Sequence, residues 1–242
     1  MIPKIIHYCW FGRNPLPPLA VKCIESWKKF LPDYEIKEWN EDNFDVNIIP
    51  YTREAYEARK YAFVSDYARF YILYHHGGLY FDTDVEVIRP MDDIVERGAF
   101  MGCENEAGIG LGCNPGLGLG CNPGLGLYAE ILGLYGGLHF KRTDGGLNLK
   151  TVVEYTTELL VAKGLKNINE IQQVGDVWIY PKEYFCPMDY ETNVINITEN
   201  TRSIHHYAAS WHNTRQKIAY LLKMKLGNSI FNKLLKMRSL WR

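Results

Sequence analysis

The N-terminal part of the chain alternates between short apolar runs and a longer helical pattern, which limits the fold more than any other feature. Residues 4–10 form an apolar run, as expected of a buried strand. Residues 19–30 have a helical pattern, and residues 34–39 resemble a second strand. This order predicts a βαβ unit with ligand-binding loops at the C-terminal ends of its strands. Trp10 stands at such an end, where it could stack on a nucleobase or pack in the core.

A later apolar strand pattern ends in two aspartates that are one residue apart. It starts at Gly77-Gly78 and runs into Asp82-Thr83-Asp84. Residues i and i+2 of a strand point to the same face, so these two carboxylates would lie side by side and repel each other if the strand continued through them. A divalent cation such as Mg²⁺ or Mn²⁺ would remove the conflict, because these ions prefer oxygen ligands. The alternative is one aspartate exposed in a turn and one that caps a backbone group.

Residues 60–75 precede the two aspartates and contain no glycine or proline. Their aromatic and aliphatic content predicts a mostly buried helix. Asp66 and Arg69 fall on one stripe of this helix. Buried charges are costly unless they are paired or bound to a ligand. Two interpretations remain: a structural ion pair, or a polar pocket in which Arg69 neutralises a phosphate and Asp66 accepts hydrogen bonds from sugar hydroxyls.

The rest of the chain contains further strand and helix patterns. Strands are predicted at residues 85–88, 100–103, 174–180 and 201–204, and helices at residues 128–135 and 149–163. The six cysteines show no paired metal spacing, so we expect reduced thiols of a cytoplasmic protein. The first residues run directly into a strand pattern, so we expect no signal peptide.

Residues 107–129 carry no charge, yet they do not form a membrane span. Eight glycines and two prolines between residues 107 and 127 exclude a stable helix. The octad GLGCNPGL occupies residues 110–117 and is repeated at residues 118–125. A single repetition is not a solenoid, so we expect a duplicated loop near the site. A metal or redox pair of Cys113 and Cys121 is the disfavoured alternative.

Residues 205–211 follow the last predicted strand and offer further polar groups. An octahedral ion held by two carboxylates and a nucleotide diphosphate has room for one more protein ligand. We expect His206 to supply it, with His205 as the second choice, although adjacent histidines are often structural or exposed. Ser210 and the indole N–H of Trp211 could donate hydrogen bonds to phosphate oxygens.

Residues 213–242 are strongly basic, with eight Lys or Arg and no Asp or Glu. Subtracting them from the 27 basic and 28 acidic residues of the chain leaves a net charge of −9 on residues 1–212. Apolar residues at helical spacing predict amphipathic helices that lie on an anionic membrane surface. A core-packed helix and an RNA-contacting tail are the alternatives, but no nucleic-acid-binding module accompanies the tail. We therefore expect a cytoplasmic protein, peripheral on the inner face of the cell membrane, that binds no nucleic acid.

The residues discussed above fall into four motifs. They are Ile2-Pro3-Lys4-Ile5-Ile6-His7 with Trp10, Ser65-Asp66 with Arg69, Gly77-Gly78 with Tyr80, Asp82 and Asp84, and His205-His206 with Ser210-Trp211. In this order they resemble glycosyltransferase family 32, the Asp-x-Asp sugar transferases. Its members include bacterial polysaccharide-synthesis enzymes, secretory-pathway α-mannosyltransferases and the catalytic domains of glucosylating toxins. The octad duplication departs from the family pattern.

The resemblance implies an α/β chain with a GT-A fold, which is a Rossmann-like αβα sandwich around a mixed central sheet. The GT-A domain would cover residues 1–212, and the basic amphipathic segment would cover residues 213–242. The family uses a nucleotide-sugar donor with Mn²⁺ or Mg²⁺ and retains the anomeric configuration. We expect a UDP-sugar and a saccharide or lipid-linked saccharide acceptor, in surface polysaccharide synthesis of the bacterial type.

The resemblance also implies roles for single residues. Trp10 would stack on the base. The donor sugar and ribose would be held by Ser65, Asp66, Arg69 and Tyr80. Asp82 and Asp84 would bind ribose and metal, His206 would complete the metal site, and Ser210 and Trp211 would bind the diphosphate. The catalytic set is then Asp66, Arg69, Asp82 and Asp84.

No carboxylate is obviously placed as a nucleophile, which favours front-face substitution assisted by the leaving phosphate. The alternatives are a nucleotide-sugar hydrolase and a non-catalytic nucleotide-sugar-binding protein on the membrane.

Overall fold

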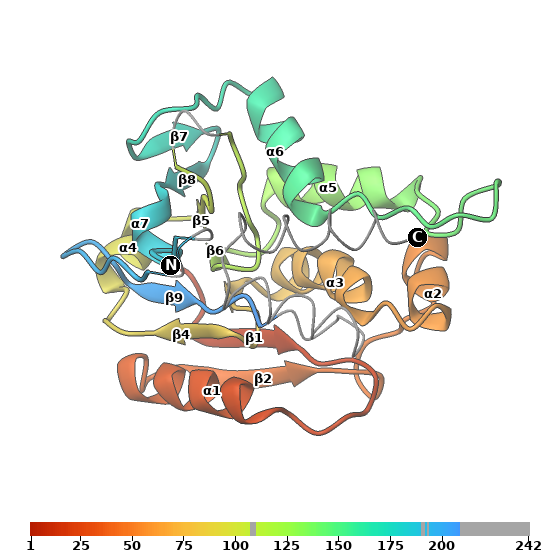
Figure 1. The fold of residues 1–242 in the computed structure, drawn as a ribbon, viewed down its shortest axis with the longest axis horizontal. Coiled ribbons are helices and arrows are strands. Elements are labelled where there is room, and N and C mark those ends of the chain that lie inside the picture. The colour runs from red at the N-terminus through yellow and green to blue at the C-terminus, as the bar shows by residue number, and fades with distance from the viewer. Residues whose placement is uncertain (107–109, 190–191, 193, 209–242) are drawn as a thin grey trace, which may run out of the picture.

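The computed structural model describes residues 1–106, 110–189, 192 and 194–208. The described chain begins with the predicted βαβ unit, made of β1 (Ile5–Cys9), α1 (Pro18–Phe30) and β2 (Glu35–Trp39) (Figure 1). β1 and β2 are parallel, which confirms the crossover. Pro18 opens α1, a position where the missing N–H of proline costs no helical hydrogen bond.

A seven-stranded mixed sheet forms the centre of the fold. Its remaining strands, in spatial order from β2 and β1, are β3 (Gly78–Tyr80), β6 (Leu119–Cys121), β5 (Phe100–Gly102), β8 (Val177–Tyr180) and β7 (Gln172–Val174). β1 is parallel to both β2 and β3, while β6 runs antiparallel to its neighbours β3 and β5. A separate two-stranded sheet pairs β4 (Val85–Val87) with β9 (Ser203–His205).

Helices cover both faces of the central sheet. One apolar cluster includes residues of α2 (Pro50–Glu57), α3 (Tyr61–His76), α5 (Gly126–Gly136) and α6 (Val152–Ala162). A second cluster includes residues of α1, α4 (Asp92–Arg97) and α7 (Lys182–Phe185) together with strand β4. The chain is therefore a three-layer α/β structure, and Figure 1 shows α1 and the α5–α6 pair on opposite sides of the sheet.

Strand residues alternate between these two clusters. Ile6, Leu79 and Phe100 contribute to the cluster around α1, whereas Tyr80 and Met101 contribute to the cluster around α3. All five are at most 1% exposed. Because successive side chains of a strand point to opposite faces, the strands pack against the helices on both faces of the sheet. Burying such side chains stabilises the fold by about 1.5–3 kcal/mol each, which fixes the strand ends that carry the polar residues.

The step from α3 to β3 depends on two glycines. Gly77 and Gly78 have backbone φ angles of 63° and 93°, which residues with a Cβ atom rarely adopt. A Cβ on Gly78 would lie 2.6 Å from the carbonyl oxygen of Ile5. The helix therefore ends as predicted. The strand does not continue through the two aspartates, because β3 ends at Tyr80 and a turn follows, closed by the hydrogen bond from the N–H of Val85 to the carbonyl of Asp82.

Other predicted elements differ only in detail. The strand predicted at residues 174–180 is split into β7 and β8 by a turn at Gly175, whose φ is 58°. The last predicted strand is β9. The predicted amphipathic helices of residues 213–242 lie outside the described residues. Among the residues that are described, no helix is both long and apolar enough to cross a membrane.

Candidate active site

Two carboxylates and an imidazole converge beside the central sheet. Each of Asp82, Asp84 and His205 offers one ligand atom, and these atoms all lie within 4.8 Å of one another. Asp82 follows β3, Asp84 precedes β4, and His205 ends β9. The antiparallel pairing of Val85 with His205 brings the third group to the first two. Two carboxylates with one imidazole suit Mn²⁺ and related divalent ions, so the residues fit the expected metal.

His205, and not the predicted His206, belongs to this cluster. Nε2 of His205 lies 3.2 Å from Oδ1 of Asp84, whereas Nε2 of His206 lies 2.8 Å from Oε2 of Glu86. Lys22 also contacts Glu86, at 2.8 Å. Neighbouring residues at the end of a strand point to opposite faces. The register of β9 against β4 therefore directs His205 toward Asp84 and His206 away from it.

Asp84 and His205 form an ion pair. Burial alone would raise the pKa of Asp84, but the charge and hydrogen bond of His205 and the N–H of Ala208 lower that pKa to about 2. The N–H of Ala208 donates to Oδ2 of Asp84 at 2.8 Å. Burial alone would lower the pKa of His205, but Asp84 raises it well above its ordinary value. Asp84 is therefore ionised at neutral pH, and His205 would release its proton when it binds a metal ion.

Arg69 connects helix α3 to the aspartates. Its Nη2 lies 3.0 Å from Oδ1 of Asp66 and 3.3 Å from Oδ1 of Asp82. Its Nη1 donates to Oδ2 of Asp82 at 3.3 Å, so the guanidinium contacts both oxygens of that carboxylate. The ring of Tyr80 lies 5.0 Å from Cζ of Arg69, and its hydroxyl donates to Oδ1 of Asp82 at 3.0 Å. The predicted ion pair between Asp66 and Arg69 exists, and it extends into the Asp-x-Asp motif.

Asp66 differs electrostatically from the other carboxylates of the site. Its side chain is nearly enclosed, with 8% of the residue exposed. Burial raises the pKa of Asp66 to about 7; Arg69 opposes this shift and the Asp82 carboxylate adds to it. A carboxyl group that titrates near neutral pH can hold or release a proton under working conditions.

The first copy of the octad lies against Asp82. The carbonyl of Gly116 accepts a hydrogen bond from the N–H of Asp82 at 3.0 Å, and a Cβ on Gly116 would collide with Oδ2 of Asp82. Oδ1 of Asn114 accepts from the N–H of Gly116 at 2.7 Å, and its amide donates to Oε2 of Glu104 at 2.8 Å. The first copy therefore lies beside the candidate site as expected, whereas the expected loop is wrong for the second copy, which contains strand β6. Asn114 and Gly116 were not among the predicted site residues, although Asn114-Pro115-Gly116 is a recognisable turn.

The other predicted donor-binding residues occupy varied places. Trp10 follows β1 at the sheet edge where Asp82 follows β3, and its indole N–H donates to the carbonyl of Asn14 at 2.6 Å. The hydroxyl of Ser65 donates within its own helix to the carbonyl of Tyr61, at 3.3 Å. Ser210 and Trp211 lie outside the described residues. Their predicted roles remain predictions.

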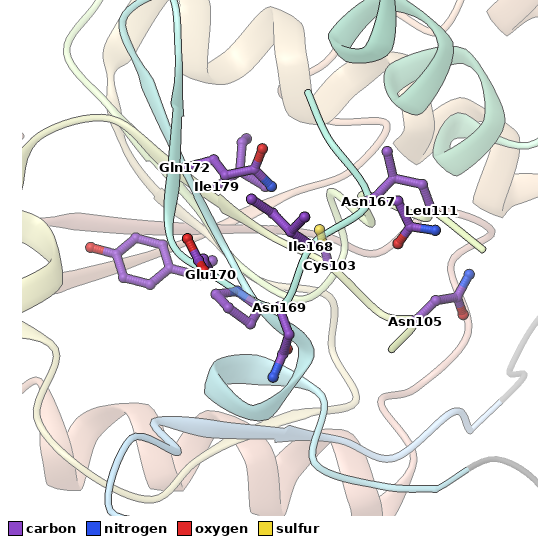
Figure 2. A pocket seen from close by; sticks show the side chains of 11 residues that line it. Cys103, Asn105, Leu111, Asn167, Ile168, Asn169, Glu170, Gln172 and Ile179 are labelled. Carbon is purple, nitrogen blue, oxygen red and sulfur yellow. The ribbon is translucent and has the colours of Figure 1, made fainter. Parts of the chain in front are cut away.

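A small pocket lies at the C-terminal ends of β5 and β8 (Figure 2). Cys103 and Pro181, which directly follow these two strands, take part in its lining. The side chains of Asn105, Asn167 and Asn169 give its rim a polar character. Neither the two aspartates nor His205 line it. The pocket is therefore separate from the candidate metal site.

Residues 17–101 match the family model of the glycosyltransferase sugar-binding region containing a DXD motif. Inositol phosphoceramide mannosyltransferase 3 of Schizosaccharomyces pombe is 32% identical over 112 residues, which are 45% of this chain and 31% of that protein. Mannosyl phosphorylinositol ceramide synthase CSH1 of Saccharomyces cerevisiae is 29% identical over 113 residues, which are 45% of this chain and 30% of that protein. The match thus spans about a third of these curated relatives. They are fungal mannosyltransferases, whereas the sequence motifs predicted the bacterial polysaccharide type.

The solved structure of the PaToxG glycosyltransferase resembles this one with a TM-score of 0.50 and 18% identity, over 67% of this chain and 70% of that chain. At this identity the likeness concerns the fold, and it confirms the expected GT-A architecture with a mixed central sheet. The region that matches the family model includes Asp66, Arg69, Asp82 and Asp84.

Proposed function

We propose that this protein transfers a hexose from a nucleotide-sugar to an acceptor hydroxyl and requires a divalent metal, Mn²⁺ or Mg²⁺. The observation that carries the proposal is the convergence of Asp82, Asp84 and His205 within 4.8 Å. Both aspartates lie in the region that matches the DXD family. A lone Asp-x-Asp would be weak support, but here the pairing of β9 with β4 places an imidazole beside the two carboxylates.

The metal, held by these three residues, would neutralise the charge that develops on the diphosphate leaving group. Arg69 would keep Asp82 in place through its two-pronged contact. Tyr80 would limit the rotation of the same carboxylate through its hydroxyl. Asp66 would accept hydrogen bonds from the donor sugar, as the resemblance implies. These residues therefore act mainly by holding charge in fixed positions.

We further propose that the reaction retains the anomeric configuration by front-face substitution. Asp66, the most buried of the candidate carboxylates, is tied to Arg69. That contact favours a positioning role over nucleophilic attack. NMR of the first product formed measures the configuration directly. Recovery of a covalent glycosyl adduct on Asp66 would contradict this step without affecting the metal site.

The sugar and the base are separate parts of the proposal. The names of the fungal relatives contain a mannosyl group, which makes mannose the first hexose to test. UDP is the expected carrier, from the resemblance to family 32. A thermal-shift screen with Mn²⁺ and a panel of UDP-hexoses, together with GDP-mannose, distinguishes these donors. The acceptor panel should contain free saccharides, lipid-linked saccharides and inositol phospholipids, since the relatives' names include inositol phosphoceramide.

The decisive experiment is donor turnover with and without added Mn²⁺ after chelation. We expect turnover to need the metal and to increase when an acceptor is added. Asp84→Asn should abolish metal-dependent turnover and keep the circular dichroism spectrum of the parent. Near-normal turnover of that variant would end the metal assignment. Release of free sugar that no acceptor suppresses would indicate a hydrolase, and donor binding by calorimetry without any turnover would indicate a binding protein.

The proposed location is the cytoplasmic face of a membrane, with the basic residues 213–242 as the contact. Flotation of the full chain with anionic and with neutral vesicles tests it. Binding to anionic vesicles should weaken as salt is raised, because the attraction is electrostatic. Equal binding to both kinds of vesicle would contradict the electrostatic contact.

A further inference from the structure

The two cysteines that face each other in the described structure are Cys103 and Cys113. Their sulfur atoms are 3.4 Å apart. Cys103 follows strand β5, and Cys113 is the cysteine of the first octad copy. Cys121, at the same place in the second copy, lies elsewhere and contacts the carbonyl of Leu73. All six cysteines are free thiols, so only one of the two duplicated cysteines meets a sulfur partner.

The backbone around the pair has the geometry that a cross-strand disulfide needs. Cys103 and Cys113 form an isolated antiparallel bridge. The flanking bonds run from the N–H of Glu104 to the carbonyl of Gly112, and from the N–H of Asn114 to the carbonyl of Gly102. This pattern defines a non-hydrogen-bonded pair, in which Cα atoms are about 4.5 Å apart. Disulfides span Cα separations of roughly 4.4–6.8 Å, so the bond needs side-chain rotation and no change of register.

One of the two thiols borders a route from solvent. Cys103 lines the pocket at the ends of β5 and β8, and Figure 2 shows its sulfur among the lining side chains. Cys103 is 8% exposed and Cys113 is fully buried. A reagent in solvent therefore reaches the sulfur of Cys103 first, and the sulfur of Cys113 lies 3.4 Å from it.

We propose that Cys103 and Cys113 are an oxidation site at which a small organic disulfide generates an intramolecular disulfide. The Cys103 thiolate attacks one sulfur of the reagent, which breaks the reagent's S–S bond and releases one thiol. The Cys113 thiolate then attacks the mixed disulfide at Cys103 and releases the second thiol. The protein loses two hydrogens and two electrons, and the reagent gains them as two thiols.

The disulfide joins the end of β5 to the loop that supports Asp82. Asn114 directly follows Cys113, and its side chain accepts a hydrogen bond from the N–H of Gly116. The carbonyl of Gly116 in turn accepts a hydrogen bond from the N–H of Asp82. The cross-link thus restrains the loop at Cys113, one residue before Asn114. The inference does not depend on the proposed transferase activity, because it concerns two thiols and a loop.

The test treats the full-length protein with oxidised glutathione, blocks remaining thiols with iodoacetamide and maps the peptides by mass spectrometry. We expect a Cys103–Cys113 linked peptide with four alkylated cysteines after unfolding. Cys121→Ser is the matched control and should form the same link. Cys103→Ser and Cys113→Ser should form none. A Cys113–Cys121 link, a glutathione adduct that stays on Cys103, or six alkylated cysteines would each overturn the proposal.

A second measurement compares the thermal stability of the oxidised and the reduced protein. The thermal midpoint of the oxidised wild-type protein should lie roughly 5 °C or more above that of the reduced protein, because the cross-link restricts the unfolded chain. The same comparison on Cys113→Ser should show no difference. If mass spectrometry shows the cross-link and the thermal midpoint is unchanged, the disulfide does not stabilise the loop and this part of the proposal is wrong.

Discussion

The indole N–H of Trp39 donates a hydrogen bond to Nδ1 of His7, over 3.0 Å between the nitrogens. Nε2 of the same imidazole lies 3.0 Å from the carbonyl oxygen of Gly77. Because Nδ1 accepts, the proton of the neutral ring resides on Nε2 and is donated to Gly77. This bond joins β1 to the glycine turn that leads into β3 and Asp82. The position of the Asp-x-Asp motif thus depends partly on a neutral histidine in the core.

Lowering the pH should destabilise the protein through His7. Burial lowers its pKa to about 4 from the ordinary 6.5, with His76 and Lys37 adding to the effect and Gly77 opposing it. The unfolded state therefore binds more protons than the folded state between these values. Stability from the neutral ring is complete above pH 6.5 and is lost as the pH falls toward about 4. At one pKa unit per about 1.4 kcal/mol, the full loss is roughly 3 kcal/mol.

Urea unfolding at about pH 7.5 and about pH 5 measures this effect in wild type and in His7→Gln. We expect the wild type to lose about 2 kcal/mol more than the variant over this interval. Equal losses would show that His7 does not titrate abnormally. Nitrogen NMR of the imidazole checks the expected Nε2–H tautomer independently.

Exchanging the two adjacent histidines for glutamine separates their roles. His205→Gln should weaken Mn²⁺ binding by roughly 10- to 100-fold, the range already seen for partners of metal ligands. His206→Gln should leave Mn²⁺ binding close to that of wild type, because its side chain contacts Glu86 on the other face. Isothermal calorimetry with Mn²⁺ gives both values. A stronger effect from His206→Gln would restore the original prediction and contradict the observed register.

Adding a methyl group at Gly116 should disturb Asp82. A Cβ there would collide with Oδ2 of that aspartate, so Gly116→Ala must displace the carboxylate or the loop. We expect at least a tenfold loss of donor turnover, or about 1.4 kcal/mol in transition-state stabilisation. Gly133→Ala in α5 is the control, since a Cβ there meets no atom within 4 Å. Unchanged turnover of Gly116→Ala would show that the octad does not constrain Asp82.

Replacing Arg69 by lysine tests the two-pronged contact with Asp82. Lysine keeps the charge but cannot contact two carboxylate oxygens with a planar fork. We expect Arg69→Lys to lose about 1–3 kcal/mol of unfolding free energy and most of its turnover. Arg13→Lys is the control, because its pair with Asp42 is exposed on both sides and such pairs contribute little. Guanidinium unfolding and turnover assays on both variants provide the comparison, and equal behaviour of the two would contradict the role of Arg69.

The sequence alone determined the elements whose signals are local. The βαβ start, helix α3 and its glycine stop follow from apolar periodicity and from residues with special backbone freedom, which act over a few neighbours. The link between Asp66 and Arg69 follows from helical spacing in the same way. Because α3 passes directly into β3, connectivity also placed this ion pair next to Asp82.

Only the tertiary structure decided which distant residues complete the site. The choice of His205 over His206 depends on the register of β9 against β4, and a shift of one residue would reverse it. The two octads are identical in sequence, yet Cys113 meets Cys103 while Cys121 enters β6. Local sequence cannot distinguish identical segments, so long-range strand pairing and packing assign each copy its place.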